Sequence, residues 1–478
     1  MKILELNESH FITGITLGSQ FQRGGLFWKA DGINPLFEIF SQQGDAAGVL
    51  RAGSAATDIT GAVVVDTIGS MASGVAKLGM LGSGGNFYSI PLTTPDAAPT
   101  NLRSGANVIT NPAIGMGVYK GNMLYAQLGQ IGAWNMSNDA YPTGWTDNAY
   151  TGLQTTYSDH QMHTFKDRIY VVNAGYIAML PDATSGAITN MIDFSSEYRA
   201  KCLSDDGQFL VIGISQATGN ANTIMNKAKI CFWDTTDPNS WQREWELPEP
   251  DIISILRDDI SMIAICPRGV YRFAYDMQPK KIMPMVLAGT STNVYPYIGT
   301  SWMNIVCWAG ADISIANDKV VYAYGSPTPD FPPVLIKPVM GLTGNITTIK
   351  GDAIYSRLYI ATDTPKLYRV NLGGTAATSV SAQTIFLNLG AKFNIQKITI
   401  TFAKALASGD SLNLDVASDY NATATDWGTY SFATHGAVQE VSITNSFKAK
   451  LLSLIFNFNG GNPGIRRIEV FGTKDTDY

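Results

Sequence analysis

The fold is decided by a stretch that reads Leu203-Ser204-Asp205-Asp206-Gly207-Gln208-Phe209-Leu210-Val211-Ile212-Gly213-Ile214. Its Asp-Asp-Gly supplies the positive-φ residue that a tight hairpin needs, and the apolar run after it has the composition of a buried strand. Further apolar runs separated by turn residues follow at 228–233, 252–256, 260–266 and 270–275. The stretch therefore predicts a meander of short antiparallel strands.

The same pattern, a polar turn beside a strand rich in Tyr, Val and Ile, recurs along the chain. The spacing of the turns scatters around the roughly 40 to 50 residues that a propeller blade occupies. We therefore predict a β-propeller of about seven blades, although six or eight blades also fit the spacing. The seven turn residues that mark the repeat are Gly84, Gly121, Asp167, Asp206, Asp258, Asp318 and Asp352.

A second alignment supports the repeat. Residues 132–145 and 231–241 both pass from a strand through a Trp and a polar turn with Pro to a second Trp, and 321–331 is a weaker third copy. The alternative is a chance similarity of hairpins that are rich in Gly and Asp.

Composition points to an all-β chain. Of 478 residues, 45% are hydrophobic and only 15% charged, with 46 Gly and 21 Pro, which indicates many turns and little exposed helix. The net charge of −6 gives no general attraction to nucleic acid or to an anionic membrane, so we expect at most a passing contact with DNA. Without a basic, apolar leader or an apolar run of about 18 residues, we expect no membrane segment and synthesis in a cytoplasm.

The predicted propeller covers residues 75–375. A small and polar stretch at 376–382 reads as a linker, and the sharper alternation of apolar and polar residues in 383–478 predicts an antiparallel β-sandwich. Residues 1–74 are predicted to form an attachment segment that also helps to close a blade. Because large aromatics anchor interfaces, Phe21, Phe27 and Trp28 are predicted to contact another subunit or another protein.

No metal or cofactor site is predicted. The four cysteines, Cys202, Cys231, Cys266 and Cys307, lie in apolar runs and are expected to be buried thiols. His160 and His163 stand beside Asp159, but residues three apart on a strand point to opposite faces, so we expect a solvated loop. Three carboxylates, Asp234, Asp237 and Asp251, lack the regular spacing of a calcium loop, and Asp before Pro commonly starts a turn.

No catalytic motif is recognisable, and the chain is therefore predicted not to be an enzyme. A carboxylate pair of the glycosidase kind can be neither shown nor excluded from spacing alone. Trp241 and Trp245, with Glu244, Glu246 and Asp251 nearby, are the candidate glycan-binding residues. A Trp-rich outer strand of a blade explains the same residues equally well.

The chain resembles β-propeller proteins of bacteriophage virions. The resemblance rests on residues 232–241, with their Asp-Pro-x-x-Trp turn, on the strand pair from Ile253 to Phe273, and on the alternating pattern from Ile398 to Val470. It spans roughly residues 75–478, and the first 60 residues match no family pattern.

The resemblance implies a structural protein of the virion tail, made in the host cytoplasm. The favoured role is a component of the tail nozzle or hub. Copies of this component form a homo-oligomeric ring, which contacts other tail proteins and extends the DNA channel below the portal. The alternative is a peripheral receptor protein, in a fibre or baseplate, that binds or cleaves glycans.

Overall fold

The structure is a computed structural model. It describes residues 1–7, 27–31, 33–34, 41–42, 51–52, 59–65, 76–93, 99–103, 108–135, 144–194, 197–216, 227–258, 261–284, 297–302, 305–311, 319–325, 334–339, 342, 344–352, 354, 357–363, 366–371, 380–384, 386–419, 423–460 and 464–475. The chain divides into two compact units: 1–47 with 320–341 and 370–478, and 48–319 with 342–369.

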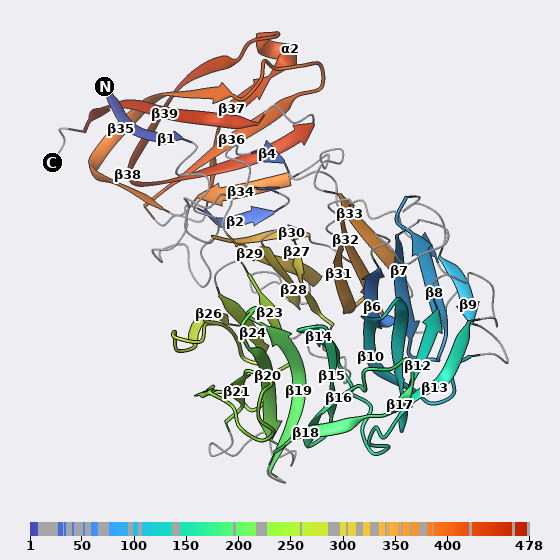
Figure 1. The fold of residues 1–478 in the computed structure, drawn as a ribbon. Coiled ribbons are helices and arrows are strands. Elements are labelled where there is room, and N and C mark those ends of the chain that lie inside the picture. The colour runs from blue at the N-terminus through green and yellow to red at the C-terminus, as the bar shows by residue number, and fades with distance from the viewer. Residues whose placement is uncertain are drawn as a thin grey trace. The chain divides into compact units, whose positions relative to one another are not determined.

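Seven sheets form a β-propeller, and all but one have four strands (Figure 1). Blade 1 consists of β6 (Ile59–Val65), β7 (Lys77–Gly82), β8 (Phe87–Pro91) and β9 (Thr100–Arg103). Blade 2 consists of β10 (Pro112–Tyr119), β11 (Asn122–Gln127), β12 (Gln130–Asn135) and β13 (Trp145–Thr151), with β17 (Gly186–Ala187) as its fifth strand. Blade 3 consists of β14 (Met162–Phe165), β15 (Arg168–Asn173), β16 (Tyr176–Met179) and β18 (Thr189–Asp193).

Blades 4 to 7 follow the same order. Blade 4 consists of β19 (Tyr198–Asp205), β20 (Leu210–Gln216), β21 (Lys229–Trp233) and β22 (Arg243–Glu246), and blade 5 of β23 (Ser254–Arg257), β24 (Met262–Cys266), β25 (Gly269–Phe273) and β26 (Lys280–Pro284). Blade 6 consists of β27 (Gly299–Trp302), β28 (Ile305–Ala311), β29 (Lys319–Gly325) and β30 (Val334–Val339). Blade 7 consists of β31 (Ile346–Asp352), β32 (Arg357–Thr362), β33 (Lys366–Asn371) and β5 (Arg51–Ala52).

The hairpins form where the sequence supplies turn residues. Lys166 and Asp167 both have positive φ, 47° and 59°, which is the type I′ geometry that matches the twist of the strands they join, β14 and β15. In the quoted stretch, Asp206 accepts hydrogen bonds from the backbone N–H groups of Gln208 and Phe209, which fixes the turn between β19 and β20. Local turn chemistry therefore sets the blade repeat.

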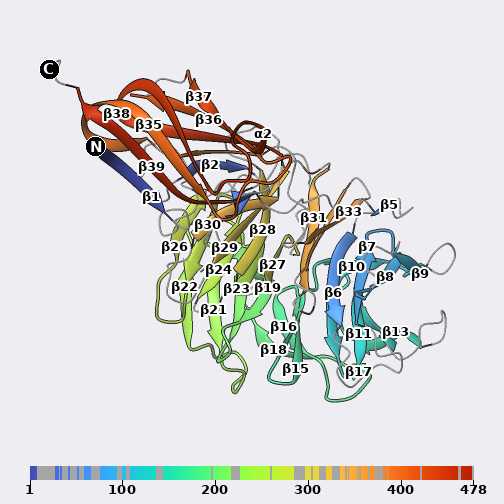
Figure 2. The same ribbon diagram turned by 90° about the horizontal axis from the view of Figure 1, so that it is seen from above.

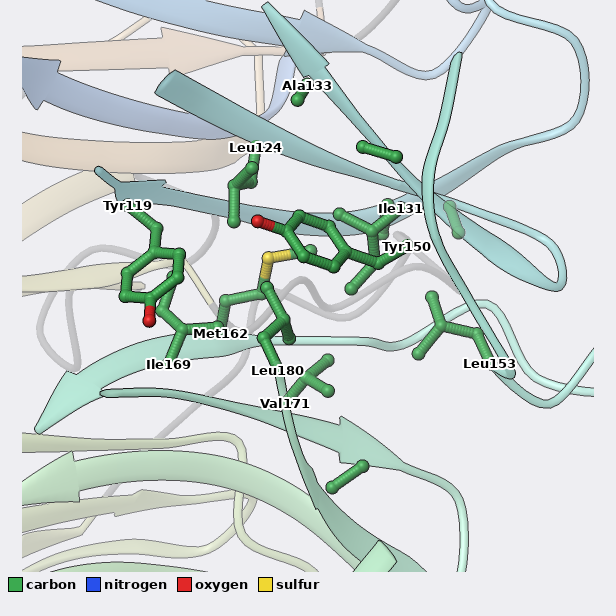
Figure 3. Close-up of a cluster of buried hydrophobic side chains, with 14 residues drawn as sticks. Tyr119, Leu124, Ile131, Ala133, Tyr150, Leu153, Met162, Ile169, Val171 and Leu180 are labelled. Carbon is green, nitrogen blue, oxygen red and sulfur yellow. The ribbon is translucent and has the colours of Figure 1, made fainter. Parts of the chain in front are cut away.

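The core of the propeller lies between blades. Figure 3 shows the cluster between blades 2 and 3, where Leu124 and Ile131 pack with Ile169 and Val171. Burying a side chain of this size stabilises the fold by roughly 1.5–3 kcal/mol. Comparable apolar clusters join blades 1 and 2, 3 and 4, and 4 and 5.

The ring is closed between its first and last blades. Leu78 and Met80 of blade 1 pack with Tyr359 of blade 7, and the Arg357 guanidinium donates to the carbonyl oxygen of Leu92 at 2.6 Å. The innermost strands contact one another in the order β6, β10, β14, β19, β23, β27, β31 and back to β6. Blade 7 takes its outer strand, β5, from the N-terminal part of the chain, so separating these blades would break a sheet.

The C-terminal strands form a single eight-stranded sheet. Its path runs β1 (Lys2–Asn7), β39 (Ile465–Lys474), β35 (Leu387–Phe402), β38 (Glu440–Gly460), β34 (Val380–Thr384) and β2 (Phe27–Asp31), with β36 (Ser411–Ser418) and β37 (Thr425–Ser431) branching from β38. Tyr430 of β37 donates to the carbonyl oxygen of Ile398 on β35, at 3.1 Å, although these strands do not pair. Tyr430 and Ile398 are both buried, so this side chain links two parts of the sheet that are not paired. Figure 2 shows the strands of the sheet from above.

The predicted fold class is confirmed: an all-β chain with seven blades and a C-terminal sheet region. The marks Gly121, Asp167, Asp206, Asp258 and Asp352 follow or end the innermost strand of their blades, Gly84 lies one hairpin further out, and Asp318 is outside the described residues. The second alignment joins equivalent strands, because Trp134 lies on β12 and Trp233 on β21. All four cysteines are free and buried.

The N-terminal residues supply strands to both units. Residues 27 and 28 lie on β2, which pairs with β34, whereas Phe21 is outside the described residues. The first blade begins with β6, inside the segment predicted as 1–74. The domain boundaries and the interface role of Phe21, Phe27 and Trp28 stay predictions. Within the described ranges, no helix has the length and apolar character needed to cross a membrane.

Candidate functional site

Polar residues gather along the innermost strands of blades 3, 4 and 5. Asp159 precedes β14, Lys201 is the fourth of the eight residues of β19, and Asp251 precedes β23. We call these three residues the Lys201 cluster. The pairing of β19 with β20 is irregular between Ala200 and Cys202, so Lys201 is an extra residue at a β-bulge. Bulges re-aim side chains and are frequent beside active sites.

Lys201 stands between the two carboxylates. Its Nζ lies 3.6 Å from Asp159 Oδ2 and 3.8 Å from Asp251 Oδ2. The side chains of Lys201, Asp159 and Asp251 are 30%, 36% and 38% exposed, respectively. The cluster is therefore open to solvent while its charges remain paired across three blades.

Asp251 is fixed by its neighbours in the fold. Its Oδ1 accepts a hydrogen bond from Ser215 Oγ on β20 and another from the backbone N–H of Ile252, at 2.9 Å. The Ser215 hydroxyl oxygen also accepts the Ile252 N–H, at 3.0 Å. One carboxylate oxygen is thus held in place, and the other faces Lys201.

The aromatic ring of Tyr297, just before β27 of blade 6, crosses the centre of the propeller. Its hydroxyl oxygen accepts the backbone N–H of Met116 on β10 of blade 2, at 2.9 Å, and lies 3.3 Å from the Met116 carbonyl oxygen. Blades 2 and 6 are not neighbours in the ring, so this side chain spans the axis. Burial raises the pKa of Tyr297 to about 12, and the nearby Asp159 carboxylate acts in the same direction.

A glycine makes room for that ring. A Cβ at Gly61, on β6, would lie 3.3 Å from both the Tyr297 ring and the Met116 side chain. Tyr297 is therefore held across the propeller centre between Gly61 and Met116. At the edge of the cluster, the Arg199 guanidinium lies over the Tyr157 ring, 4.5 Å from its centroid.

A second charged group joins the same three blades further along their inner strands. Asp205, at the end of β19, accepts from His163 of blade 3 at 2.8 Å and from Arg257 of blade 5 at 2.9 Å. We call His163, Asp205 and Arg257 the Asp205 cluster. Partial burial acts to raise the pKa of Asp205, but His163 and Arg257 outweigh it and hold the pKa below its usual range.

The two predicted glycan-binding residues are both half-buried on the outer part of blade 4. The Trp241 ring lies 5.8 Å from the Phe194 ring, and Trp245 donates its indole N–H to the carbonyl oxygen of Ala274 at 3.0 Å. The nearby Glu244 and Glu246 pair with Lys229 and Lys227. These contacts join neighbouring blades, and glycan binding by Trp241 and Trp245 stays a prediction.

The histidine pair and the acidic turn have structural partners. His160 is buried, with its ring nitrogens 2.9 Å from Val172 O and 3.1 Å from Tyr157 O, so its predicted place in a solvated loop is wrong. A parallel bridge at Asp159 draws the segment into the core. Asp234 accepts from the Thr236 N–H and hydroxyl, as a turn starter does. Among the described residues, no group of three or more His, Cys, Asp or Glu could hold a metal ion.

The sequence carries one signal for the Lys201 cluster. Each of the three residues precedes the turn mark of its own blade: Asp159 precedes Asp167, Lys201 precedes Asp206, and Asp251 precedes Asp258. The separations from the marks are 8, 5 and 7 residues (167−159, 206−201 and 258−251), so aligning the repeat on the marks brings the three residues to the same part of their blades but not to one register. Tyr297 has no such signal, because the mark of its blade lies one hairpin further along.

Comparisons with known proteins found distant similarity to solved propeller structures. No protein family and no curated protein matches the sequence. Among solved structures, the chain is similar to the Dos1 propeller, with a TM-score of 0.44 and 11% identity over 67% of this chain and 80% of that one. It is also similar to the WD40 propeller domain of Doa1, with a TM-score of 0.43 and 11% identity over 66% and 92%. An ancestral GH74 enzyme gives a TM-score of 0.46 and 11% identity over 67% and 48%.

These comparisons correct one prediction. The absence of a recognisable catalytic motif predicts that the chain is not an enzyme; that prediction is wrong as an inference from the sequence, because the solved structures similar to this chain include an ancestral GH74 enzyme and an exo-β-1,3-galactanase. At such low identities and TM-scores the likeness assigns no activity to this chain. Nothing in the comparisons links the chain to a phage tail.

Proposed function

We propose that this chain is a structural protein of a tailed bacteriophage virion, a component of the tail nozzle or hub. The sequence resemblance supports this, and the segments that carry it fold as coherent parts. Residues 232–241 and 253–273 belong to blades 4 and 5, and 398–470 belong to the C-terminal sheet.

The observation that carries the proposal is how the chain ends are held. Strand β1 pairs with β39 and β2 pairs with β34, so strands from both ends of the chain share one sheet. The next N-terminal strand, β5, completes blade 7. Neither the sheet nor the ring of blades can open without breaking strand pairing, which suits a part that stays closed while DNA is ejected.

The occupied propeller centre limits where DNA can pass. Because Tyr297 spans the propeller centre, a DNA channel would have to lie between protomers of a homo-oligomeric ring. The net charge of −6 suits a channel wall that must not retain DNA. The other partners are neighbouring tail proteins, for which Phe21, Phe27 and Trp28 are the proposed contacts, and the chain is made in the host cytoplasm before assembly.

Imaging of the particle tests the proposal. We expect this chain on the tail axis as a closed ring, because a heterologous contact repeated around an axis must close or grow into a filament. Density only on fibres or on the capsid surface would contradict the nozzle role and favour the receptor alternative.

A photo-crosslinking residue at position 21, 27 or 28 tests the contacts. We expect adducts with another subunit or another tail protein in assembled particles. Deleting residues 1–35 is a poor substitute, because it would remove β1 and β2 from the C-terminal sheet. Absence of adducts from all three positions would contradict the interface role alone and leave the place on the tail axis to the imaging.

A further inference from the structure

The Lys201 cluster has hydrogen-bonding groups that its own residues do not use. The contacts of Lys201 Nζ with Asp159 and Asp251, at 3.6 and 3.8 Å, are longer than the 2.7–3.2 Å of a direct hydrogen bond. Among the described residues, the structure gives no hydrogen bond to the Lys201 ammonium or to the Asp159 carboxylate. Three donors and two acceptor oxygens are thus held side by side, partly exposed.

The spacing suits a group that both donates and accepts. A hydroxyl of a ligand, placed between the ammonium and a carboxylate, would accept a hydrogen bond from Lys201 and donate one to Asp159. A second hydroxyl, on the adjacent carbon of the ligand, would accept from Lys201 and donate to Asp251. Hydrogen bonds to charged groups are about twice as strong as neutral ones. Adjacent hydroxyls of this kind are what a sugar ring presents.

Charge narrows the choice of ligand. Two carboxylates flank one ammonium, so a phosphate or a nucleic acid would be repelled on both sides. The ammonium already stands where a metal cation would bind between Asp159 and Asp251. Since neither an anion nor a metal cation suits the cluster, an uncharged polyol is favoured.

We propose that the Lys201 cluster binds a neutral saccharide through adjacent hydroxyls, close to Tyr297. Tyr297 gives the site a rigid neighbour, because its ring is packed against Gly61 and its hydroxyl is bonded to Met116. The bulge at Lys201 is what directs the ammonium between the two carboxylates. This binding does not depend on where the protein lies in the virion.

An array of bacterial surface polysaccharides and simple oligosaccharides tests the proposal. The full chain should bind at least one neutral glycan, and calorimetry with that glycan should show at least tenfold weaker binding for Lys201→Met and for Asp159→Asn. Trp241→Ala is the matched control, and its affinity should stay within twofold.

The outcomes separate the alternatives. If the wild type binds no arrayed glycan, or if Lys201→Met binds as tightly as the wild type, the proposal is overturned. Loss of binding only in Trp241→Ala or Trp245→Ala would move the site to the outer part of blade 4. Far-ultraviolet circular dichroism and thermal melting verify that each variant is folded, and Lys201→Gln repeats the test if Lys201→Met is not.

Discussion

Two charged clusters, one at the middle and one at the end of the same inner strand, β19, join the same three blades. In one, a lysine of blade 4 stands between carboxylates of blades 3 and 5, and in the other, an aspartate of blade 4 stands between His163 of blade 3 and Arg257 of blade 5. Lys201 and Asp205 are four residues apart, about 13 Å along β19. The arrangement is the same, but the signs of the charges are exchanged.

The clusters differ in how well their hydrogen-bonding groups are satisfied. Asp205 accepts direct bonds at 2.8 to 2.9 Å from His163, Arg257 and the backbone N–H of Gly207. Lys201 makes only longer ion pairs. A satisfied cluster stabilises the fold, whereas an unsatisfied and exposed one is suited to a ligand, so position in the repeat alone does not decide which role a charge has.

The largest effect is expected from removing the Tyr297 ring near the Lys201 cluster. Tyr297→Ala deletes an aromatic ring packed against Gly61 and should lower the free energy of unfolding by about 3–5 kcal/mol. Tyr297→Phe keeps the ring, loses only the hydroxyl contacts with Met116, and should cost about 1–3 kcal/mol. Urea unfolding measures both, and a Tyr297→Ala cost below that of Tyr297→Phe would contradict the packed ring.

A matched pair of substitutions then breaks each cluster in turn. Asp205→Ala leaves His163, Arg257 and the Gly207 N–H without their acceptor and should cost about 2–3 kcal/mol. Asp159→Ala removes one long, exposed ion pair and should cost less than about 1 kcal/mol. Equal costs in urea unfolding would remove the distinction between the clusters.

Much of this architecture could be predicted from the sequence, because turn chemistry is local. Asp206 and Gly207 form their hairpin with near neighbours, and such turns recur once per blade. The sequence predicts that residues 1–74 help to close a blade, but neither strand β5 nor its place in blade 7 could be predicted, because Arg51 and Ala52 pair with residues more than 300 positions away. Pairing at that separation leaves no local periodicity to read.

The site was harder to predict than the fold. In the sequence, Asp159 stands next to His160, and Asp251 groups with Asp234 as a candidate ligand of calcium. The structure instead brings Asp159 and Asp251 to Lys201, which lies on a third blade. The bulge that directs Lys201 depends on a one-residue mismatch between β19 and β20. Periodicity within one strand cannot reveal such a mismatch.

A smaller effect is expected from the turn beside Asp205. Gly207 has φ of +91°, and a Cβ there would lie 3.2 Å from the guanidinium nitrogens of Arg257. Gly207→Ala should therefore lower the free energy of unfolding by about 1–2 kcal/mol, through backbone strain and displacement of Arg257. Gly409→Ala is the control for strain without a neighbour, because its φ is +93° and a Cβ there would have no atom within 4 Å. If Gly207→Ala costs no more than this control, Arg257 is not held tightly.

The smallest effect is expected in the acid dependence of stability. The pKa of Asp205 is lower in the folded chain than its ordinary value near 4, so its contribution is complete at neutral pH. That contribution should be lost as the pH falls below about 4 and through the lowered pKa, because the unfolded chain takes up the proton first. In Asp205→Asn this part of the pH dependence should be absent, and a curve parallel to that of the wild type would show that the ion pairs do not matter.

The most direct test of the two roles compares the cations of the two clusters, Lys201 and Arg257. Lys201→Met and Arg257→Met each remove one positive charge, and glycan affinity and the free energy of unfolding are measured for both. We predict that Lys201→Met weakens binding at least tenfold with nearly unchanged stability. We predict the reverse for Arg257→Met, which frees Asp205 from its partner and should keep full affinity. Loss of stability without loss of binding in Lys201→Met, or loss of binding in a stable Arg257→Met, would contradict the assignment of ligand binding to one cluster and structural support to the other.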